Sequence, residues 1–348
     1  MIIVGDIAIP ELNSIRIEIA ENLRGKNWIG NLEGGIILDE SNSKKNQGVF
    51  NGKNAIDSIF NKINFVGVSL ANNHILDTNS LLETIFYLNE KKISHCGAGL
   101  NINEAKKPIV HFENGVEIII LNFGWEVIQC KVANGKTKGV NPLTRENTLS
   151  TLKSAKEKYP NAKIITIMHW SYELEGEPQP FERELAKYLI DNGADGIIGC
   201  HPHRIGGFEL YKNKPIVYSL GNWMFKQFFY RKSKLKFPDF CNQELAFEWD
   251  LKTNEIKFHF FNFNPIESTL IYTHSEDINS DTMTRYTPFR GLSNEEYKVW
   301  YKKNHYHKGK GLPIYYWEDS NLKILIKNKI NKLRDLSISI IHKSIQKI

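Results

Sequence analysis

The 348-residue sequence has only four cysteines, and no two of them stand at C-x-x-C spacing. Zinc knuckles and dithiol redox motifs are therefore not expected, and four scattered thiols indicate a reducing compartment. No run of about 18 apolar residues occurs, so we expect no transmembrane helix. The first residues, MIIVGDIAIP, lack the basic segment and the long apolar run of a signal peptide. These features predict a cytoplasmic protein.

A dense basic block of the kind that nucleic-acid-binding arms carry is also missing. Charged residues make up 24% of the chain and give a formal net charge of +6. Aromatic residues lie in strand-like runs, where core packing explains them. We therefore expect no nucleic-acid partner. The mild positive charge favours an anionic partner of another kind, such as a small phosphorylated molecule or an acidic polymer.

Short apolar runs alternate with helical patterns over the first two thirds of the chain. Buried strands are predicted for runs such as MIIVGD, INFVGVSLA, VEIIILNFG, AKIITIMHW and ADGIIG. Helices are predicted for LTRENTLSTLKSAKEKY and FERELAKYLIDNG, and hairpins for IGGFELYKNKPIVYSLGN and QELAFEWDLKTNEIKFHFFNFNP. This order indicates an α/β fold with a mixed sheet core and helices outside it.

The composition changes in the last quarter of the chain. Residues 275–320 are polar and aromatic with little periodicity, and residues 320–348 predict one basic amphipathic helix or two short ones. We therefore divide the chain into a domain of residues 1–268 and a C-terminal extension of residues 269–348. Two interpretations of the terminal helix stay open. It packs on the domain with its lysines in water, or it makes peripheral contact with the inner face of an anionic membrane.

Side chains of the types that bind metals stand at the ends of five strand-like runs. They are Asp6, Glu33, Asn72, Asn73, His74, His169, His201 and His203. Because the carboxyl ends of strands form the functional crevice of α/β folds, we expect these side chains to converge. Carboxylates, carboxamides and imidazoles together suit Zn, Mn or Fe. Each residue alone also fits a turn, a cap or a core position, and the agreement across five strand ends favours a metal centre.

The ordered motifs GD, NLE, ANNHILD, HWSYE, GADGIIGCHPH and KPIVYSLGNWMF resemble the CapA family of capsule or poly-γ-glutamate synthesis proteins. This family is a branch of the calcineurin-like metallophosphoesterase superfamily. The resemblance covers residues 2–228, and its most specific block runs from His169 to Phe225. It implies a four-layer α/β/β/α sandwich with a di-metal site at one edge of the sheets.

The resemblance also implies a role for each matching residue. The implied ligands of one or two divalent ions (Mn, Zn or Fe) are Asp6, Glu33, Asn73, His169, His201 and His203. His74 would be the general acid, and Asp77 would orient it. The residues expected to bind substrate are Glu173, Asn222 and Arg204.

The sequence departs from the superfamily pattern near the metal ligands. Ala8 stands where the superfamily has a histidine, and Glu33 stands where it has a bridging aspartate. We therefore expect one well-furnished ion site and one poorer site. Their ligands would be Glu33, Asn73, His169 and His201 for the first, and Asp6, Glu33 and His203 for the second. Cys200 precedes His-Pro-His where many members have histidine, and we interpret it as a substitution at a position that binds no metal, with a soft ligand as the alternative.

Two functions of different classes follow from the resemblance. The first is a metal-dependent hydrolase, a phosphoesterase in which an activated water attacks a phosphate ester and His74 protonates the leaving oxygen. The second is a non-catalytic accessory of capsule or extracellular polymer synthesis that binds an acidic polymer or a partner of the synthesis machinery. The retained ligand positions favour the hydrolase, because an inert scaffold has no need of them.

Overall fold

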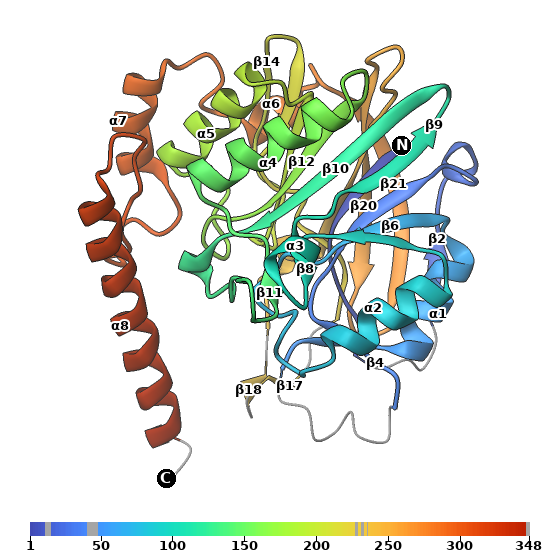
Figure 1. Ribbon diagram of the computed structural model, residues 1–348, viewed down its shortest axis with the longest axis horizontal. Coiled ribbons are helices and arrows are strands. Elements are labelled where there is room, and N and C mark those ends of the chain that lie inside the picture. Colours follow the sequence, from blue (N-terminus) through green and yellow to red (C-terminus); the bar gives the residue numbers. More distant parts are fainter. Residues whose placement is uncertain (11–14, 40–47, 227–228, 231–232, 235, 346–348) are drawn as a thin grey trace.

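The computed structural model describes residues 1–10, 15–39, 48–226, 229–230, 233–234 and 236–345. Two sheets lie against each other and helices cover their outer sides, as Figure 1 shows. The four-layer order α/β/β/α expected from the sequence is therefore confirmed. Within the described residues, no helix has both the length and the hydropathy needed to cross a membrane.

The larger sheet is mixed, and its described strands follow the order β2-β21-β20-β19-β1-β3-β6-β7, with β16 also paired to β1. Its strands are β1 (Ile2–Ala8), β2 (Arg16–Glu18), β3 (Trp28–Leu32), β6 (Phe65–Ser69), β7 (Ser94–Cys96), β16 (Asn222–Phe225), β19 (Gln243–Trp249), β20 (Ile256–Asn264) and β21 (Thr269–Asp277). Strands β1, β3, β6 and β7 run parallel, so their carboxyl ends lie at one edge of the sheet.

The smaller sheet has the order β14-β15-β13-β12-β10-β9 in the described part of the chain. Its strands are β9 (Ile109–Glu113), β10 (Val116–Gly124), β12 (Lys163–His169), β13 (Gly196–Cys200), β14 (Phe208–Tyr211) and β15 (Lys214–Val217). Strands β10, β12, β13 and β15 run parallel. The short pairs are β4 (Gly35–Ile37) with β5 (Phe50–Gly52), β8 (Ala98–Gly99) with β11 (Gly139–Val140), and β17 (Phe229–Tyr230) with β18 (Ser233–Lys234).

Helices form the two outer layers and the C-terminal extension. The α-helices are α1 (Lys53–Lys62), α2 (Leu81–Glu90), α3 (Ile102–Ala105), α4 (Arg145–Lys158), α5 (Pro180–Asp191), α6 (Asp281–Tyr286), α7 (Asn294–Asn304) and α8 (Asn321–Ile345). Helix α4 begins where the Thr144 side chain accepts a hydrogen bond from the backbone of Asn147, and α5 begins at Pro180. Helix α4 packs on β10 and β12, and α7 packs on α5 (Figure 1).

Central strands such as β1 and β13 are buried on both faces because the sheets are covered on both sides there, whereas β9 and β21 keep exposed residues. In β1, Ile2 and Val4 contact the core beneath the helices, whereas Ile3 points into the core between the sheets. In β10, Ile118 lies between the sheets and Ile119 lies on the helix side. Successive side chains of a strand therefore pack alternately into two separate cores, which explains the continuous apolar runs in the sequence.

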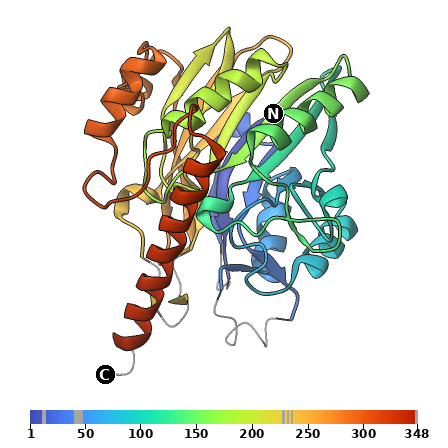
Figure 2. The same cartoon turned by 60° about the vertical axis from the view of Figure 1, so that its left-hand side comes forward.

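The division expected at residue 268 falls between two paired strands. Strand β21 pairs antiparallel with β20 from Thr269 to Asp277, so the first part of the expected extension belongs to the larger sheet. The remainder lies outside the sheets, and α8 is one continuous helix rather than two short ones. Figure 2 shows α8 running along the body and projecting beyond it. The two-domain division at residue 268 stays a prediction.

Candidate metal centre

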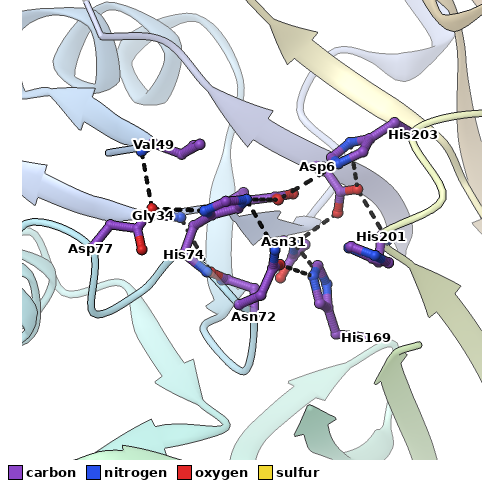
Figure 3. A network of polar contacts seen from close by, with 12 residues as sticks. Asp6, Asn31, Gly34, Val49, Asn72, His74, Asp77, His169, His201 and His203 are labelled. Carbon is purple, nitrogen blue, oxygen red and sulfur yellow. Dashed lines mark hydrogen bonds and ion pairs between the residues drawn. The ribbon is translucent and has the colours of Figure 1, made fainter. Parts of the chain in front are cut away.

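Parallel strands of both sheets end at the same edge of the sandwich and bring the candidate ligands together (Figure 3). Glu33 follows β3 directly, and His169 is the last residue of β12. The sequence suggested that Asp6 follows its strand, but β1 continues to Ala8, so Asp6 lies inside the strand. The strand is longer than expected because Asp6 and Ala8 pair with β16.

Asp6 lies at this edge of the sheet because Gly5 allows the backbone of β1 to approach the backbone at Gly221 closely. The register of β1 against β3 shifts between Val4 and Asp6, and the Asp6 amide donates to the Gly221 carbonyl at 3.0 Å. A Cβ on Gly5 would lie only 1.9 Å from the Gly221 oxygen. Glycine at this position is thus required sterically, and it sets Asp6 opposite Asn222 in parallel register.

The His-Pro-His turn after β13 directs two imidazoles into the same space. His201 and His203 have φ angles of 97° and 58°, in the left-handed region that residues with a side chain rarely adopt. The His201 amide donates to Oδ2 of Asp6 at 3.0 Å and so anchors the turn on β1. The ring of His201 lies 4.8 Å from that of His169 and 5.6 Å from that of His203. Backbone strain of this kind clusters at functional sites.

Two groups of ligand-type atoms result, and Glu33 belongs to both. The atoms within each group lie within 4.8 Å of one another, and the members are Glu33, His169 and His201 in the first, and Asp6, Glu33 and His203 in the second. Asn73 lies beside the first group, since its Oδ1 is 2.8 Å from Nε2 of His169. All six predicted ligands therefore lie in one cluster, in the two sets expected from the sequence, and their binding of metal stays a prediction.

Buried polar atoms without a hydrogen bond show that this cluster fits a cation. Among the described residues, none donates a hydrogen bond to either carboxylate oxygen of Glu33, and Nδ1 of His201 also lacks one. Both side chains are buried. A buried carboxylate left in that state destabilises the fold unless a cation or a proton compensates it. The nitrogen and oxygen donors are of the types that Zn, Mn and Fe bind.

The electrostatics of the cluster favour a cation as well. Burial raises the pKa of Asp6 to about 7, and burial followed by the charge of Asp6 raises the pKa of Glu33 well above its ordinary value. Burial lowers the pKa of His203 to about 3 and holds the pKa values of His169 and His201 well below their ordinary range. The imidazoles are therefore neutral near pH 7 and offer lone pairs, whereas the adjacent carboxyls need a shared positive charge to ionise together.

His203 is oriented by Asn222, one of the predicted substrate contacts. Nδ1 of His203 lies 2.9 Å from Oδ1 of Asn222, and Nδ2 of Asn222 donates to the Cys241 carbonyl at 3.2 Å. With Nδ1 as the donor, Nε2 of His203 faces Glu33, 3.7 Å from Oε1. Asn222 therefore lies behind a candidate ligand, where such hydrogen bonds tune metal affinity. Its contact with a substrate stays a prediction.

Asn31 is a central residue that the sequence pattern missed. It lies inside β3, and its Nδ2 donates to Oδ1 of Asp6 at 2.7 Å and lies 3.5 Å from Nδ1 of His169. Its own Oδ1 accepts a hydrogen bond from Ser69 at 3.1 Å. The amide thus links a carboxylate of one sheet to an imidazole of the other. A polar residue in a fully buried strand was the signal that could have found it.

Hydrogen bonds at both ring nitrogens hold His74 in place. Its Nδ1 lies 2.7 Å from Oδ2 of Asp77, which also accepts the Val49 amide at 3.2 Å. Its Nε2 lies 3.7 Å from Oε1 of Glu33 and accepts a hydrogen bond from Nδ2 of Asn73 at 2.9 Å. The carboxylate of Asp77 therefore fixes the ring so that Nε2 points into the cluster. The general-acid role itself stays a prediction.

The other two predicted substrate residues lie beside the cluster rather than in it. Glu173 is exposed, and its charge contributes to the raised pKa of Glu33, after the larger effects of burial and of the charge of Asp6. Arg204 is half-buried and belongs to neither ligand group. Its guanidinium lies 4.8 Å from the centre of the Phe240 ring and donates to the carbonyl of Leu174 at 3.3 Å.

The C-terminal extension holds the loop that follows β12, residues 171–177. The carboxylate of Glu175 accepts the amide of Tyr306 at 2.9 Å and that of His307 at 3.4 Å. The His307 ring in turn contacts the Glu173 carbonyl, with Nε2 2.5 Å from the oxygen. The loop that carries Glu173 is therefore fixed by residues far away in the sequence.

Cys200 lies apart from the ligand groups. It packs in the apolar core between the two sheets, and none of the groups found among the described residues includes it. Burial, followed by the charge of Asp6, raises the pKa of its thiol well above the ordinary value, so the thiol stays protonated. These facts favour a substitution at a position that binds no metal over a soft ligand.

The chain is similar to proteins named for capsule synthesis. It is 29% identical over 217 residues to the capsule biosynthesis protein CapA of Bacillus anthracis, which covers 60% of this chain and 53% of that protein. It is 33% identical over 173 residues to the PGA biosynthesis protein CapA of Bacillus subtilis, covering 49% of this chain and 45% of that protein. The chain thus spans about half the length of the curated relatives it matches.

Among solved structures, the chain is similar to the 5'-nucleotidase precursor from Thermus thermophilus. The match has 12% identity and a TM-score of 0.39, and it covers 73% of this chain and 45% of that one. The four-layer arrangement of the sheets and helices follows from the strand order and does not depend on this match. The model of the family described as bacterial capsule synthesis protein PGA_cap matches residues 17–227, more than half of the chain. This segment holds most of the cluster, from Glu33 to Asn222, and by this match the chain belongs to the PGA_cap family of bacterial capsule synthesis proteins.

Proposed function

We propose that this chain is a metal-dependent phosphoesterase that acts in the synthesis of a capsule or another extracellular polymer. The observation that carries the proposal is the position of Glu33. Its buried carboxylate is shared by two groups of nitrogen and oxygen donors and accepts no hydrogen bond from the described residues. A shared carboxylate of this kind would suit a pair of cations, which together serve displacement at phosphorus.

The residues that would hold the ions are those of the cluster. They are Glu33, Asn73, His169 and His201 on one side, and Asp6, Glu33 and His203 on the other. Bound Mn, Zn or Fe would polarise phosphoryl oxygens and lower the pKa of a water molecule. The chain itself keeps the three imidazoles neutral by burial and fixes their directions through Asn222, Asn31 and the backbone of the His-Pro-His turn.

Proton transfer to the leaving group is the task proposed for His74. With Nδ1 held by Asp77, a protonated His74 directs its other proton into the cluster, where the leaving oxygen of an ester would lie. The Asp77 carboxylate offsets the positive charge of that imidazolium and keeps the ring in place. Glu173 and Arg204 remain the proposed contacts for the rest of the substrate.

A non-catalytic accessory of polymer synthesis is the second candidate function. The burial of the candidate ligands favours this function, because ions held by buried residues suit a structural role. Asp6, Glu33 and His169 are all 0% exposed. In this alternative the ions stabilise the edge of the sandwich, and the positively charged chain binds an acidic polymer or a partner of the synthesis machinery. Family membership agrees with either function.

The experiment that separates the two candidates uses the full chain, stripped of metal and reloaded with Mn, Zn or Fe. It is assayed on phosphomonoesters and phosphodiesters with aryl and alkyl leaving groups. The phosphoesterase hypothesis predicts metal-dependent hydrolysis that falls by more than ~100-fold in His201→Ala, since even outer hydrogen-bond partners contribute up to that factor. Metal binding without hydrolysis of any ester, together with binding of poly-γ-glutamate, would favour the accessory.

A further inference from the structure

Helix α8 turns a polar side toward the body of the protein. Asn331 is only 4% exposed, and its Nδ2 donates to the hydroxyls of Tyr172 and Tyr315 at 3.0 and 3.1 Å. The Tyr315 hydroxyl donates to Oδ1 of Asn328 at 2.8 Å, and Ile324 packs on the core beside them. A helix of a globular protein normally buries its apolar face, so this contact reverses the usual arrangement.

The opposite side of α8 is apolar and faces solvent. The exposed apolar residues among its described side chains are Leu322, Leu325, Ile326, Ile330, Leu333 and Leu336. Leu322 is 66% exposed and Leu333 is 65% exposed. With 3.6 residues per turn, Leu322, Ile326 and Leu333 share the face directed away from the body. Figure 2 shows that the C-terminal part of α8 projects past the rest of the molecule. A contiguous apolar patch of this kind marks an interaction surface.

The charged residues around this exposed apolar stripe of α8 indicate which kind of partner it binds. Residues 320–334 contain no acidic residue, and their basic residues are Lys323, Lys327, Lys329, Lys332 and Arg334. Lys327 pairs with Asp319, and Lys332 pairs with Glu126 at 3.1 Å. Lys323 and Lys329 are exposed on the same outer side as the stripe. The surface therefore presents apolar and cationic groups together.

A second copy of α8 matches this surface less well, because α8 holds one acidic residue, Asp335, against several lysines, and two copies would bring mainly basic residues together. An anionic bilayer surface does match, since its acyl region accepts the leucines while its headgroups attract the lysines. Lysine stems can extend along the apolar surface and keep their charge at the headgroups.

We propose that α8 is a peripheral membrane-binding helix that lies on an anionic bilayer, with Leu322, Ile326 and Leu333 inserted among the lipids. The segment expected from the sequence was 320–348, of which residues 346–348 lie outside the described residues. This proposal does not depend on catalysis at the metal centre. A negative result for membrane binding would therefore leave the proposed phosphoesterase function untouched, and the reverse also holds.

The test is co-sedimentation of the full chain with phosphatidylcholine vesicles that contain or lack phosphatidylserine. Binding to the anionic vesicles is expected, and it weakens as salt screens the charges. Ile326→Ser combined with Leu333→Ser should lower partitioning by ~100-fold or more, because two apolar side chains lose their burial. Lys323→Gln combined with Lys329→Gln should lower it about 30-fold, and only on anionic vesicles.

A matched control uses two exposed apolar residues elsewhere, Leu82 and Phe86 on α2, which are 60% and 57% exposed. Changing both to serine should leave vesicle binding unchanged. Circular dichroism checks that every variant is folded.

Three results would overturn the proposal. The first is a full chain that stays in the supernatant with anionic vesicles at low salt. The second is an equal loss of binding in the α2 control. The third is a dimer in analytical ultracentrifugation that Ile326→Ser with Leu333→Ser converts to a monomer, without vesicle binding, which would identify a second copy as the partner.

Discussion

Nδ1 of His203 lies 2.9 Å from Oδ1 of Asn222, and this hydrogen bond directs the opposite nitrogen of the ring toward Glu33. His203 lies in the turn after β13 of the smaller sheet and Asn222 begins β16 of the larger sheet, and they meet because Asn222 lies in register with Asp6 on β1. A hydrogen bond behind a metal-binding imidazole fixes both its tautomer and its direction. The weaker of the two ligand groups is therefore expected to depend on a residue that does not itself bind the ion.

Asn222→Ala is predicted to lower metal affinity in the group of Asp6, Glu33 and His203 by about 10- to 100-fold. The other group should keep its affinity, because its members do not contact Asn222. Isothermal titration of the metal-stripped protein measures both steps. Asn222→Asp retains an acceptor for Nδ1 and should recover most of the loss. Unchanged affinity in the alanine variant would show that His203 needs no such support.

His74→Asn is predicted to slow hydrolysis of alkyl phosphates by ~10²–10⁴-fold, the usual contribution of a general acid. Aryl phosphates with acidic leaving groups should be slowed much less, since their leaving oxygens need little protonation. Asp77→Asn should show the same selectivity with a smaller loss. The measurement is kcat for a matched series of esters. An equal loss for both ester types would assign His74 a ligand or structural role instead.

Glu175→Ala is predicted to destabilise the protein by about 1–3 kcal/mol, because the amides of Tyr306 and His307 lose their acceptor. Glu175→Gln keeps one acceptor oxygen and should lose less. Urea unfolding gives the free energies, and hydrogen exchange should show faster exchange in residues 171–177. An alanine variant with wild-type stability and exchange would mean that the extension does not hold this loop.

Glu248→Gln is predicted to reduce stability near pH 7 by ~1–3 kcal/mol and progressively less in acid. Burial opposes ionisation, but hydrogen bonds from His259 and Lys26 outweigh it and lower the pKa of Glu248 to about 2 from an ordinary 4.5. Because the folded pKa lies below the unfolded one, the stabilisation is complete above pH 4.5 and is lost as pH falls through about 2. Urea unfolding at several pH values tests this, and a pH-independent difference between the two proteins would contradict it.

Much of the fold follows from local patterns. Short apolar runs predicted the buried strands, and the turn at Lys212 and Asn213, both with positive φ, confirms the predicted hairpin. Helices α6 and α7 were not predicted, because their sequences carry few aliphatic residues. In α7 the spacing of the buried Tyr297 and Tyr301 was the available signal, since aromatic residues four apart share one helix face.

The site residues that stand at the end of a strand could be predicted from the sequence. Glu33 and His169 follow or close parallel strands, and topology then brings them to one edge. Positions set by distant contacts were not predictable. Asn31 matters because a second sheet lies against it, and Arg204 points toward Phe240 and Leu174, which no local pattern indicates.

The metal content of the full chain is the property on which the proposed metal centre depends. After removal of metal and titration with Mn, Zn and Fe, we expect one tightly held ion and a second, weaker one. His201→Ala should lose the tight ion and keep its circular dichroism spectrum. His274→Ala, which changes an exposed histidine on β21, should bind like the wild type. A wild-type chain that holds no divalent ion, or a His201→Ala variant that binds as tightly, would contradict the proposed metal centre.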